Sequence, residues 1–227
     1  MQVEIWSDVV CPWCYLGKAR FEKALAGFEH RDEVTVTYRS FELDPGKTGT
    51  EPLLDMLTAK YGPQAAEMEQ RVAGLAEAEG LGYRTDREIG NTFDAHRVLH
   101  LAREKGLENE MVSALFRANF AEARAVFTGE VLAEVAEEAG LPRAEAEAVL
   151  ADPSRYADAV RAEEREASEL GAGGVPFFVL GRRFGVSGGQ SVEVFAQALE
   201  QAWEASAGNP ESSPQHEKRH PARAQLR

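Results

Sequence analysis

The chain has few of the residues on which metal sites and disulfide-stabilised folds depend. Its 227 residues include only two cysteines, Cys11 and Cys14, and five histidines. A single pair three positions apart excludes the disulfide framework of small secreted domains. A structural zinc site needs four ligands, and no second C-x-x-C pair is present to complete one. Any function of the two thiols must therefore be inferred from their spacing and from the residues around them.

Positive charge and long apolar runs are scarce as well. Lysine and arginine total 25 against 38 acidic residues, which gives a net charge of −13. Nucleic-acid-binding proteins usually present a basic face, so we expect no nucleic-acid partner. No run approaches the roughly 18 apolar residues of a membrane span, and residues 1–6 do not resemble the start of a secretory signal. We therefore expect a cytoplasmic protein without a membrane partner, where a close cysteine pair is more often catalytic or metal-binding than structural.

Apolar residues, by contrast, make up 44% of the chain and can form a sizeable core. Residues 3–10 predict a short buried strand, and residues 34–41, rich in β-branched and aromatic side chains, predict a second strand. Residues 21–28 between them show helical spacing. Strand character returns over residues 175–186, which predict a hairpin turning at Gly181. A final helix is expected from Ser191 onward.

The middle of the chain shows helical rather than strand-like patterns of apolar residues. No strand is expected between about residues 51 and 150, and helices are predicted near residues 68–79, 95–102, 111–116 and 131–139, with another, heavily charged, over residues 154–170. This order predicts an α/β chain with a small mixed sheet. Residues 1–50 and 151–206 would form a discontinuous sheet domain, residues 51–150 an all-helical insertion, and residues 208–227 a disordered tail.

The cysteine pair follows the first predicted strand and opens a helix. The first turn of a helix has free N–H groups and a partial positive charge, which stabilise a thiolate at Cys11. Pro12 suits the first helical position. Helical geometry brings Cys14 back towards Cys11, so Cys11 is expected to be the exposed attacking thiol and Cys14 the more buried resolving thiol. Pro12 and Trp13 would help to set the reduction potential.

Two other interpretations of the pair remain open from the residues alone. His96 and His100, at i and i+4 on one helix, could complete a Cys2His2 zinc site if the insertion delivered both imidazoles to the sulfurs. The pair could also be unreactive. The strand before it, the proline within it and the helix after it all favour redox chemistry, and we expect no metal.

Several separated motifs resemble the thioredoxin-fold dithiol oxidoreductases, and in particular the DsbA family. They are residues 11–14 (CPWC) after a first strand and residues 173–179 (GGVPFFV) before a hairpin. Residues 7–17 (SDVVCPWCYLG), 91–97 (NTFDAHR) and 186–190 (VSGGQ) are similar to FrnE-like proteins. The resemblance spans about residues 2 to 205. It implies a thioredoxin-like fold, a mixed four-stranded sheet with a large all-helical insertion.

The resemblance also implies a function and a set of site residues. The chain would exchange disulfides with protein or small-thiol substrates, with glutathione as a candidate co-substrate and no cofactor beyond its own redox-active disulfide. It implies a cis peptide between Val175 and Pro176, where the Val175 backbone pairs with an extended substrate; the alternative is a trans proline that starts an edge strand. Trp13 is interpreted as a wall of the substrate groove.

The 91–97 motif admits two interpretations. Asn91 could cap a helix while Asp94 serves its first turn. The family resemblance implies instead that this helix faces the groove, so that Asn91, His96 or Arg97 binds substrate, with the two larger side chains as candidates for contacting a carboxylate.

Two further functions compete with disulfide exchange. The kappa-class glutathione transferases and 2-hydroxychromene-2-carboxylate isomerases resemble the chain in the helical insertion and the Val-Pro loop, but they typically carry serine at the nucleophile position and lack the second cysteine. A non-enzymatic chaperone is the third hypothesis. An exposed apolar helical face could also support a homodimer, although no heptad pattern decides this.

Overall fold

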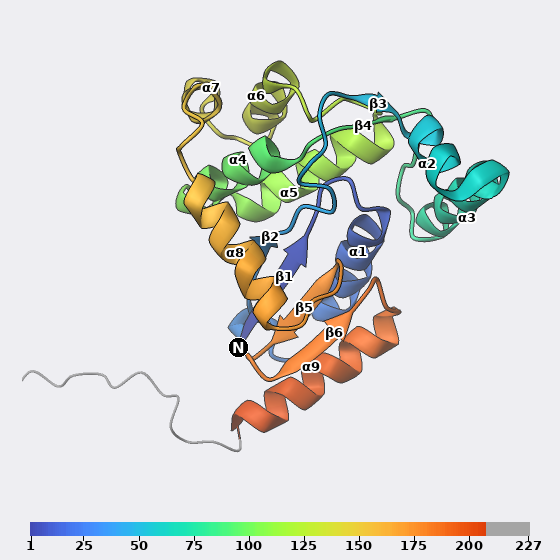
Figure 1. Ribbon diagram of the computed structural model, residues 1–227. Coiled ribbons are helices and arrows are strands. Elements are labelled where there is room, and N and C mark those ends of the chain that lie inside the picture. The colour runs from blue at the N-terminus through green and yellow to red at the C-terminus, as the bar shows by residue number, and fades with distance from the viewer. Residues whose placement is uncertain (208–227) are drawn as a thin grey trace, which may run out of the picture.

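The computed structural model describes residues 1–207, and a four-stranded mixed sheet lies at its centre (Figure 1). The strand order is β2 (Thr35–Ser40), β1 (Gln2–Ser7), β5 (Phe177–Leu180) and β6 (Phe184–Ser187). β1 pairs with β2 in parallel and with β5 antiparallel, and β5 pairs antiparallel with β6. This is the thioredoxin-like sheet expected from the sequence. The predicted tail, residues 208–227, lies outside the described residues.

Helices cover both faces of the sheet. α1 (Pro12–Gly27) packs against α9 (Val192–Ala207) on one face, and α8 (Ala157–Glu169) contacts β2 on the other (Figure 1). Side chains alternate along a strand. Phe178 of β5 therefore contacts Phe21 of α1 and Phe195 of α9. Phe177, its neighbour in the chain, packs with Trp6 towards α8.

The insertion is helical, as predicted, with two short strands added. Its elements are β3 (Glu51–Pro52), α2 (Leu53–Tyr61), α3 (Ala65–Ala78), β4 (Glu88–Ile89), α4 (Phe93–Glu104), α5 (Glu108–Phe116), α6 (Gly129–Glu138) and α7 (Arg143–Ala151). The prediction that this region contains no strand is wrong, because β3 pairs with β4. Two-residue strands, one of them containing a proline, give no alternating pattern that a sequence could reveal. Three short helical turns, η1 (Arg31–Glu33), η2 (Gly62–Gln64) and η3 (Arg117–Ala121), complete the elements.

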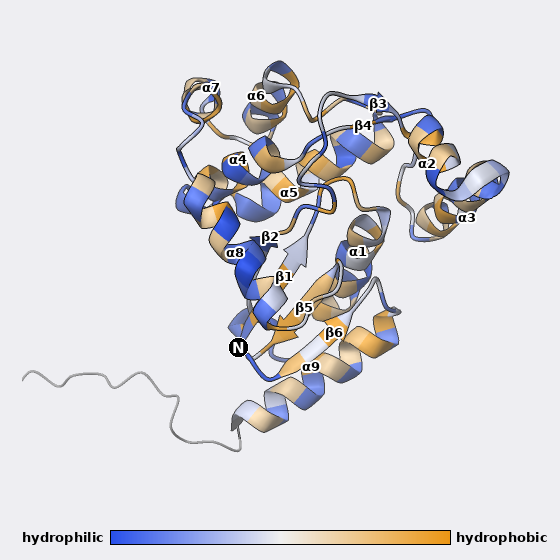
Figure 2. Ribbon diagram, viewed as in Figure 1, coloured by the Kyte–Doolittle hydropathy of each residue, from blue (hydrophilic) through white to orange (hydrophobic). Residues whose placement is uncertain are grey.

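The helix α8 is mostly hydrophilic in Figure 2, yet a carboxylate near its middle is buried. Glu163 accepts hydrogen bonds from Arg39 at 2.9 Å, from Arg103 at 2.7 Å and from the backbone N–H of Ser40 at 2.7 Å. Burial alone would raise the pKa of Glu163, but His100 and Arg103 hold that pKa well below its usual range. The ionised carboxylate thereby ties α8 to β2 and to α4 of the insertion.

Candidate active site

Cys11 and Cys14 lie where β1 ends and α1 begins. Cys11 is the N-cap residue of α1, and Pro12 occupies the start of the helix, where its missing N–H costs nothing. The backbone N–H of Cys14 donates to the carbonyl of Cys11 at 3.1 Å, so one tight turn holds the two residues together. Both are free thiols. Cys11 therefore stands at the N-terminal, positive end of the α1 dipole.

The two thiols differ in their surroundings, but not as the sequence predicted. The expectation of an exposed Cys11 is wrong, since its exposed fraction is 4% and that of Cys14 is 2%. The Cys11 sulfur lies 3.5 Å from the carbonyl oxygen of Val175, which covers it from one side. Cys11 lines a cavity and Cys14 does not. Burial, together with the neighbouring Cys11, raises the pKa of the Cys14 thiol well above its ordinary value.

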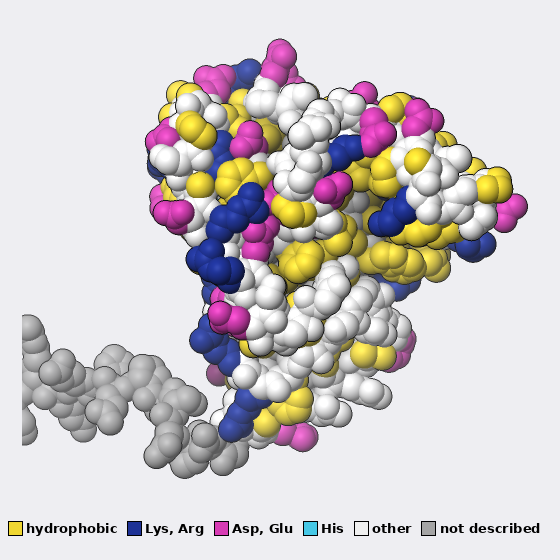
Figure 3. Space-filling view, viewed as in Figure 1, with side chains coloured by type: hydrophobic (Ala, Val, Ile, Leu, Met, Phe, Trp, Pro, Cys, Tyr) yellow, Lys and Arg dark blue, Asp and Glu magenta, His cyan; other side chains and the backbone are white. Residues whose placement is uncertain are grey.

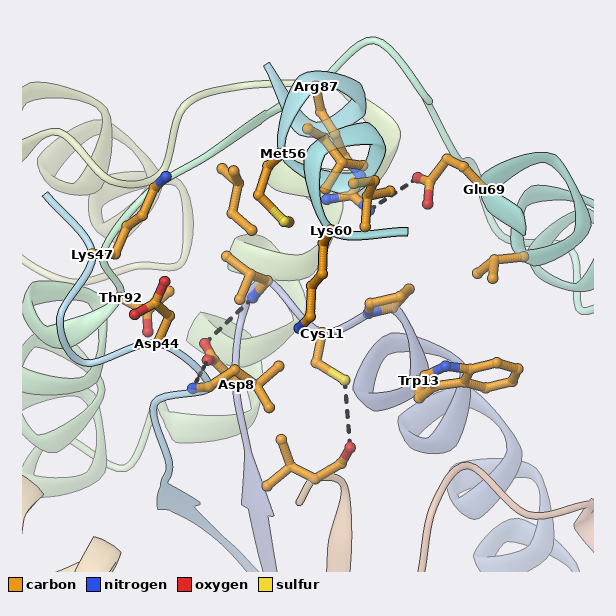
Figure 4. A pocket seen from close by; sticks show the side chains of 18 of the residues that line it. Asp8, Cys11, Trp13, Asp44, Lys47, Met56, Lys60, Glu69, Arg87 and Thr92 are labelled. Atoms are coloured by element: carbon orange, nitrogen blue, oxygen red, sulfur yellow. Dashed lines mark hydrogen bonds and ion pairs between the residues drawn. The ribbon is translucent and has the colours of Figure 1, made fainter. Parts of the chain in front are cut away.

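The cavity has a volume of about 440 Å³ and is shown in Figure 4. The sheet domain contributes its floor and the insertion its opposite wall, and the apolar members of the lining are Val10, Pro12, Trp13, Leu43, Leu53, Met56, Leu57, Tyr61, Met68, Val72, Ile89 and Val175. Hydrophobic side chains gather in the hollow beneath α2 and α3 in Figure 3. Trp13 is 43% exposed and lines this space, as expected of a groove wall.

The loop before β5 completes the site. The peptide bond between Val175 and Pro176 is cis, which confirms the predicted geometry. The carbonyl of Pro176 accepts a hydrogen bond from the N–H of Gly188 at 2.8 Å, so the loop is fixed to the turn after β6. This arrangement places the Val175 backbone beside Cys11.

A buried acid–base pair adjoins the cysteines. The Asp8 carbonyl accepts the N–H of Cys11 at 3.1 Å, and its carboxylate accepts the N–H of Leu43 at 2.7 Å. The Nε2 atom of His96 lies 3.8 Å from the Asp8 carboxylate, too far for a hydrogen bond but close enough for an ion pair. Burial alone would lower the pKa of His96, but Asp8 and, more weakly, Glu42 and Glu164 raise it. Asp8 lines the cavity, whereas His96 does not.

The structure does not bring the rest of the 91–97 motif to the cavity. The Arg97 side chain is 2% exposed, and its guanidinium donates to the carbonyls of Val149 at 2.8 Å and Asp152 at 2.6 Å. Asn91 accepts the N–H of Phe93 at 2.9 Å and donates to Glu42 at 3.0 Å. It thus pairs the first N–H of α4 from the position before the N-cap, which is Thr92 and not Asn91 as the sequence also allowed.

The expected contact of Asn91, His96 and Arg97 with substrate therefore has no geometric basis. Asn91, which precedes α4, bonds to Glu42. Within α4, His96 lies beside Asp8, and Arg97 bonds to the carbonyls of Val149 and Asp152. The spacing of residues along a helix does not reveal which other element each face of that helix will contact.

The zinc hypothesis also finds no support in the geometry. Within residues 1–207, no three or more His, Cys, Asp or Glu side chains gather closely enough to hold a metal ion. His100 lies 3.3 Å from Glu163 and belongs to the group of charged side chains around that buried carboxylate.

Sequence reasoning missed the charged residues that line the cavity. They are Asp8, Asp44, Lys47, Lys60, Glu69 and Arg87. Asp8 had a usable signal, because it stands at the end of the first strand, three positions before Cys11. Lys60, Glu69 and Arg87 come from the insertion, where no motif marks them.

The sheet, the cysteine pair at the start of a helix and the Val-Pro loop beside it define a thioredoxin-fold protein with a dithiol site. The particular family follows from comparison, because a model of the DSBA-like thioredoxin domain matches residues 2–200. The chain belongs to this family, and membership supports an oxidoreductase acting on thiols and disulfides in general.

Solved structures agree with this assignment. A probable DsbA oxidoreductase from Streptomyces coelicolor is 56% identical, with a TM-score of 0.87 over 99% of this chain and 94% of its own. The cytosolic disulfide reductase DsbM from Pseudomonas aeruginosa, solved with glutathione, is 21% identical, with a TM-score of 0.65 over 90% of this chain and all of its own (100%). A 2-hydroxychromene-2-carboxylate isomerase is 16% identical, with a TM-score of 0.64 over 92% of this chain and 98% of its own. The last two show the shared fold alone, so the isomerase hypothesis is not favoured.

Among residues 1–207, no helix combines the length and the apolar character that crossing a bilayer would require.

Proposed function

We propose that the chain is an FrnE-like thiol–disulfide oxidoreductase that cycles Cys11 and Cys14 between the dithiol and the disulfide. One observation carries the proposal. Cys11 lines the cavity, while Cys14, one helical turn further on, is buried outside it. An incoming disulfide therefore meets Cys11 first, and the resolving thiol is already in place.

The reaction proceeds in two balanced steps. The Cys11 thiolate attacks one sulfur of a substrate disulfide, a bond forms between Cys11 and that sulfur, and the other sulfur leaves as a thiolate that takes up a proton. Cys14 then loses its proton and attacks Cys11, which releases the second substrate thiol. The substrate gains two electrons and the protein is left with a Cys11–Cys14 disulfide. The reverse sequence oxidises a dithiol substrate.

The neighbouring residues support these steps in different ways. The positive end of the α1 dipole lies at Cys11, the residue whose sulfur carries the negative charge when it attacks. A raised pKa keeps Cys14 protonated until the mixed disulfide forms. Pro12 and Trp13, the two residues between the sulfurs, tune the reduction potential. Val175 and Pro176 hold the substrate segment next to Cys11.

The proposal extends to the wider setting of the reaction. The chain works in the cytoplasm on protein or small-molecule disulfides, with glutathione as a candidate co-substrate and its own disulfide as the only redox group. The similarity in fold to DsbM, which was solved with glutathione, supports the small-thiol part of this proposal.

A redox titration in glutathione buffers, quenched by alkylation and read by mass spectrometry, tests the mechanism. We expect one reversible two-electron step that joins Cys11 to Cys14. Cys11→Ser should lower disulfide exchange to the uncatalysed rate. Cys14→Ser should still react but stop at a mixed disulfide on Cys11. Full exchange by Cys11→Ser, or turnover that survives in Cys14→Ser, contradicts the mechanism.

A further inference from the structure

Arg87 lines the cavity, and the thiol chemistry does not use it. Its side chain is only 1% exposed. The Nη2 atom donates to Glu69 at 3.1 Å and to the hydroxyl of Tyr83 at 2.9 Å. Nε and Nη1, which carry three N–H bonds between them, have no acceptor among the residues that the structure describes. Buried charged donors are expensive to leave unpaired, so these N–H groups point to a ligand.

The guanidinium of Arg87 is held rigidly. It lies over the ring of Phe120 at 4.5 Å and near the ring of Tyr83 at 5.3 Å. The backbone carbonyl of Arg87 accepts the N–H of Leu53 at 3.0 Å, which fixes it to the start of α2. Stacking and backbone pairing thus prevent the charge from turning out to water, and a preorganised donor loses little entropy on binding.

Arg87 and Cys11 occupy opposite parts of one cavity. Figure 4 shows Arg87 beside Glu69 at one end, Cys11 at the other and Lys60 between them. Lys60 has no carboxylate within 4.0 Å in the described part of the chain, whereas Lys47 pairs with Glu51. Lys60 therefore adds a positive charge without a carboxylate partner between Arg87 and Cys11, while Arg87 is paired with Glu69, and Asp8 and Asp44 place two carboxylates on the same lining.

We infer that the cavity binds a small disulfide with an apolar body and a carboxylate group, which Arg87 recognises while Cys11 attacks the sulfur. The inference rests on the proposed function and names its substrate class. A volume of about 440 Å³, a mostly apolar lining and a few converging polar groups are typical of small-molecule sites. A charge-assisted hydrogen bond from a fixed guanidinium is the usual means of selecting a carboxylate.

The small disulfide reacts by the same two-step exchange, in which every bond that breaks is replaced by one that forms. The sulfur–sulfur bond of the small disulfide breaks, one half joins Cys11 and the other leaves as a thiol. Attack by Cys14 releases the second half, so two electrons pass from the protein to the substrate. Arg87 takes no part in the bond changes and only positions the carboxylate.

Two aromatic disulfides that differ only in the carboxylate test the inference. Reduced protein is mixed with 6,6′-dithiodinicotinic acid or with 2,2′-dithiodipyridine in buffered saline, and thione release is followed by stopped-flow absorbance. Each rate is divided by the rate of the same reagent with N-acetylcysteine, which removes intrinsic reactivity. We expect the carboxylated reagent to be preferred by at least about tenfold, as a charge-assisted hydrogen bond allows. The net charge of −13 opposes this result, so a preference would reflect a specific site.

Variants assign the preference to one residue. Arg87→Gln should reduce the normalised ratio to about one, since it removes the charged donor. Arg84→Gln is the matched control, because Arg84 pairs with Asp86 in solvent and does not line the cavity. It should keep the wild-type ratio. A ratio that is unchanged in Arg87→Gln, or lost equally in both variants, overturns the assignment.

A second measurement needs no variant. Nicotinate, but not its neutral analogue nicotinamide, should slow the reaction of wild-type Cys11 with 2,2′-dithiodipyridine. Equal protection by both, or by neither, overturns the inference even if Arg87→Gln fails to fold. The substrate class and the proposed function can be tested separately. If the reagents form a Cys11–Cys14 disulfide but the protein shows no preference for the carboxylated one, only the substrate class is wrong. If neither reagent produces that disulfide, the proposed function itself is wrong.

Discussion

At the scale of single residues, the site depends on what surrounds each titratable group. Cys11 and Cys14 are chemically identical, yet one lines the cavity and the other is enclosed, and burial raises the pKa of the enclosed one. The same principle applies to Asp8 and His96, whose side chains are 1% and 2% exposed. Desolvation and a partner of opposite charge act on His96 in opposite directions, and the partner prevails.

This balance gives a pH dependence of stability. Because the folded-state pKa of His96 is raised above its unfolded value of about 6.5, the charged imidazole stabilises the fold below that pH, and the contribution is lost as the pH rises through the folded-state pKa. We expect the free energy of unfolding of wild type to exceed that of His96→Gln by more at pH 5.5 than at pH 9. Urea unfolding at both pH values measures the difference.

The control for this experiment is the other member of the pair. In an Asp8→Asn background, the pH-dependent effect of His96→Gln on the free energy of unfolding should shrink, because the carboxylate that raises the pKa is gone. The attribution to Asp8 is incorrect if the effect persists in that background.

Residue identity alone predicted some of these roles and not others. The cysteine pair, Pro12 and the position of Trp13 were evident from spacing, because they belong to one short segment. The sequence singled out Arg97, which belongs to the 91–97 motif, and gave no signal for Arg87. One ends up bonded to backbone carbonyls and the other in the cavity, and only the packing of α4 and α2 against their neighbours decides this.

At the scale of elements, the start of α1 is held by the turn that follows β6. A Cβ atom on Gly189 would lie 2.8 Å from the carbonyl oxygen of Trp13 and 3.3 Å from the backbone nitrogen of Gly17. The carbonyl of Gly189 also accepts a hydrogen bond from Arg20 at 2.8 Å. This close approach requires glycine, and it fixes the helical turn that carries both cysteines.

Gly189→Ala should therefore disturb the site through the backbone of α1. We expect a loss of about 1–3 kcal/mol in the free energy of unfolding, typical of overpacking, and slower disulfide exchange. Denaturant unfolding and the 2,2′-dithiodipyridine rate are the measurements. Gly173→Ala is the matched control, since a Cβ there would meet nothing within 4 Å. Equal effects at both positions would show that the contact with α1 is not the cause.

Most elements were predictable because their patterns are local. β1, β2 and the β5–β6 hairpin follow from runs of β-branched and aromatic residues, and α4, α5 and α6 from apolar spacing. β3 and β4 were missed because they are held only by each other across the insertion. α2 and α7 were missed because they bury few side chains, Leu53 in α2 and Ala146 and Val149 in α7, whereas α5, which is equally long, buries five apolar residues.

At the scale of the whole molecule, the sheet domain and the insertion share one core. A single buried cluster includes Ile5 of β1, Phe21 of α1, Val98 of α4 and Leu132 of α6. The boundaries at residues 51 and 150 therefore separate the two parts along the chain, but the buried side chains of the two parts pack against each other. The Glu163 network adds a polar link between the two parts.

A shared core predicts cooperative unfolding. The three tryptophans, Trp6, Trp13 and Trp203, all belong to the sheet domain. Far-UV circular dichroism, in contrast, reports mainly on helices, of which the insertion supplies most. We expect the fluorescence and dichroism transitions in urea to coincide. Two separated midpoints would mean that the insertion unfolds by itself and that the common core contributes little.

The covering of Cys11 by Val175 has a consequence for biosynthesis. The two residues are 164 positions apart, so the ribosome completes the reactive pair long before it makes the loop that shields it. Domains tend to fold as they emerge, amino-terminal segments first. Until residue 175 is translated, the Cys11 sulfur lacks the carbonyl that covers it in the folded protein. The cavity around Cys11 is therefore complete only after the last sheet strands have been made.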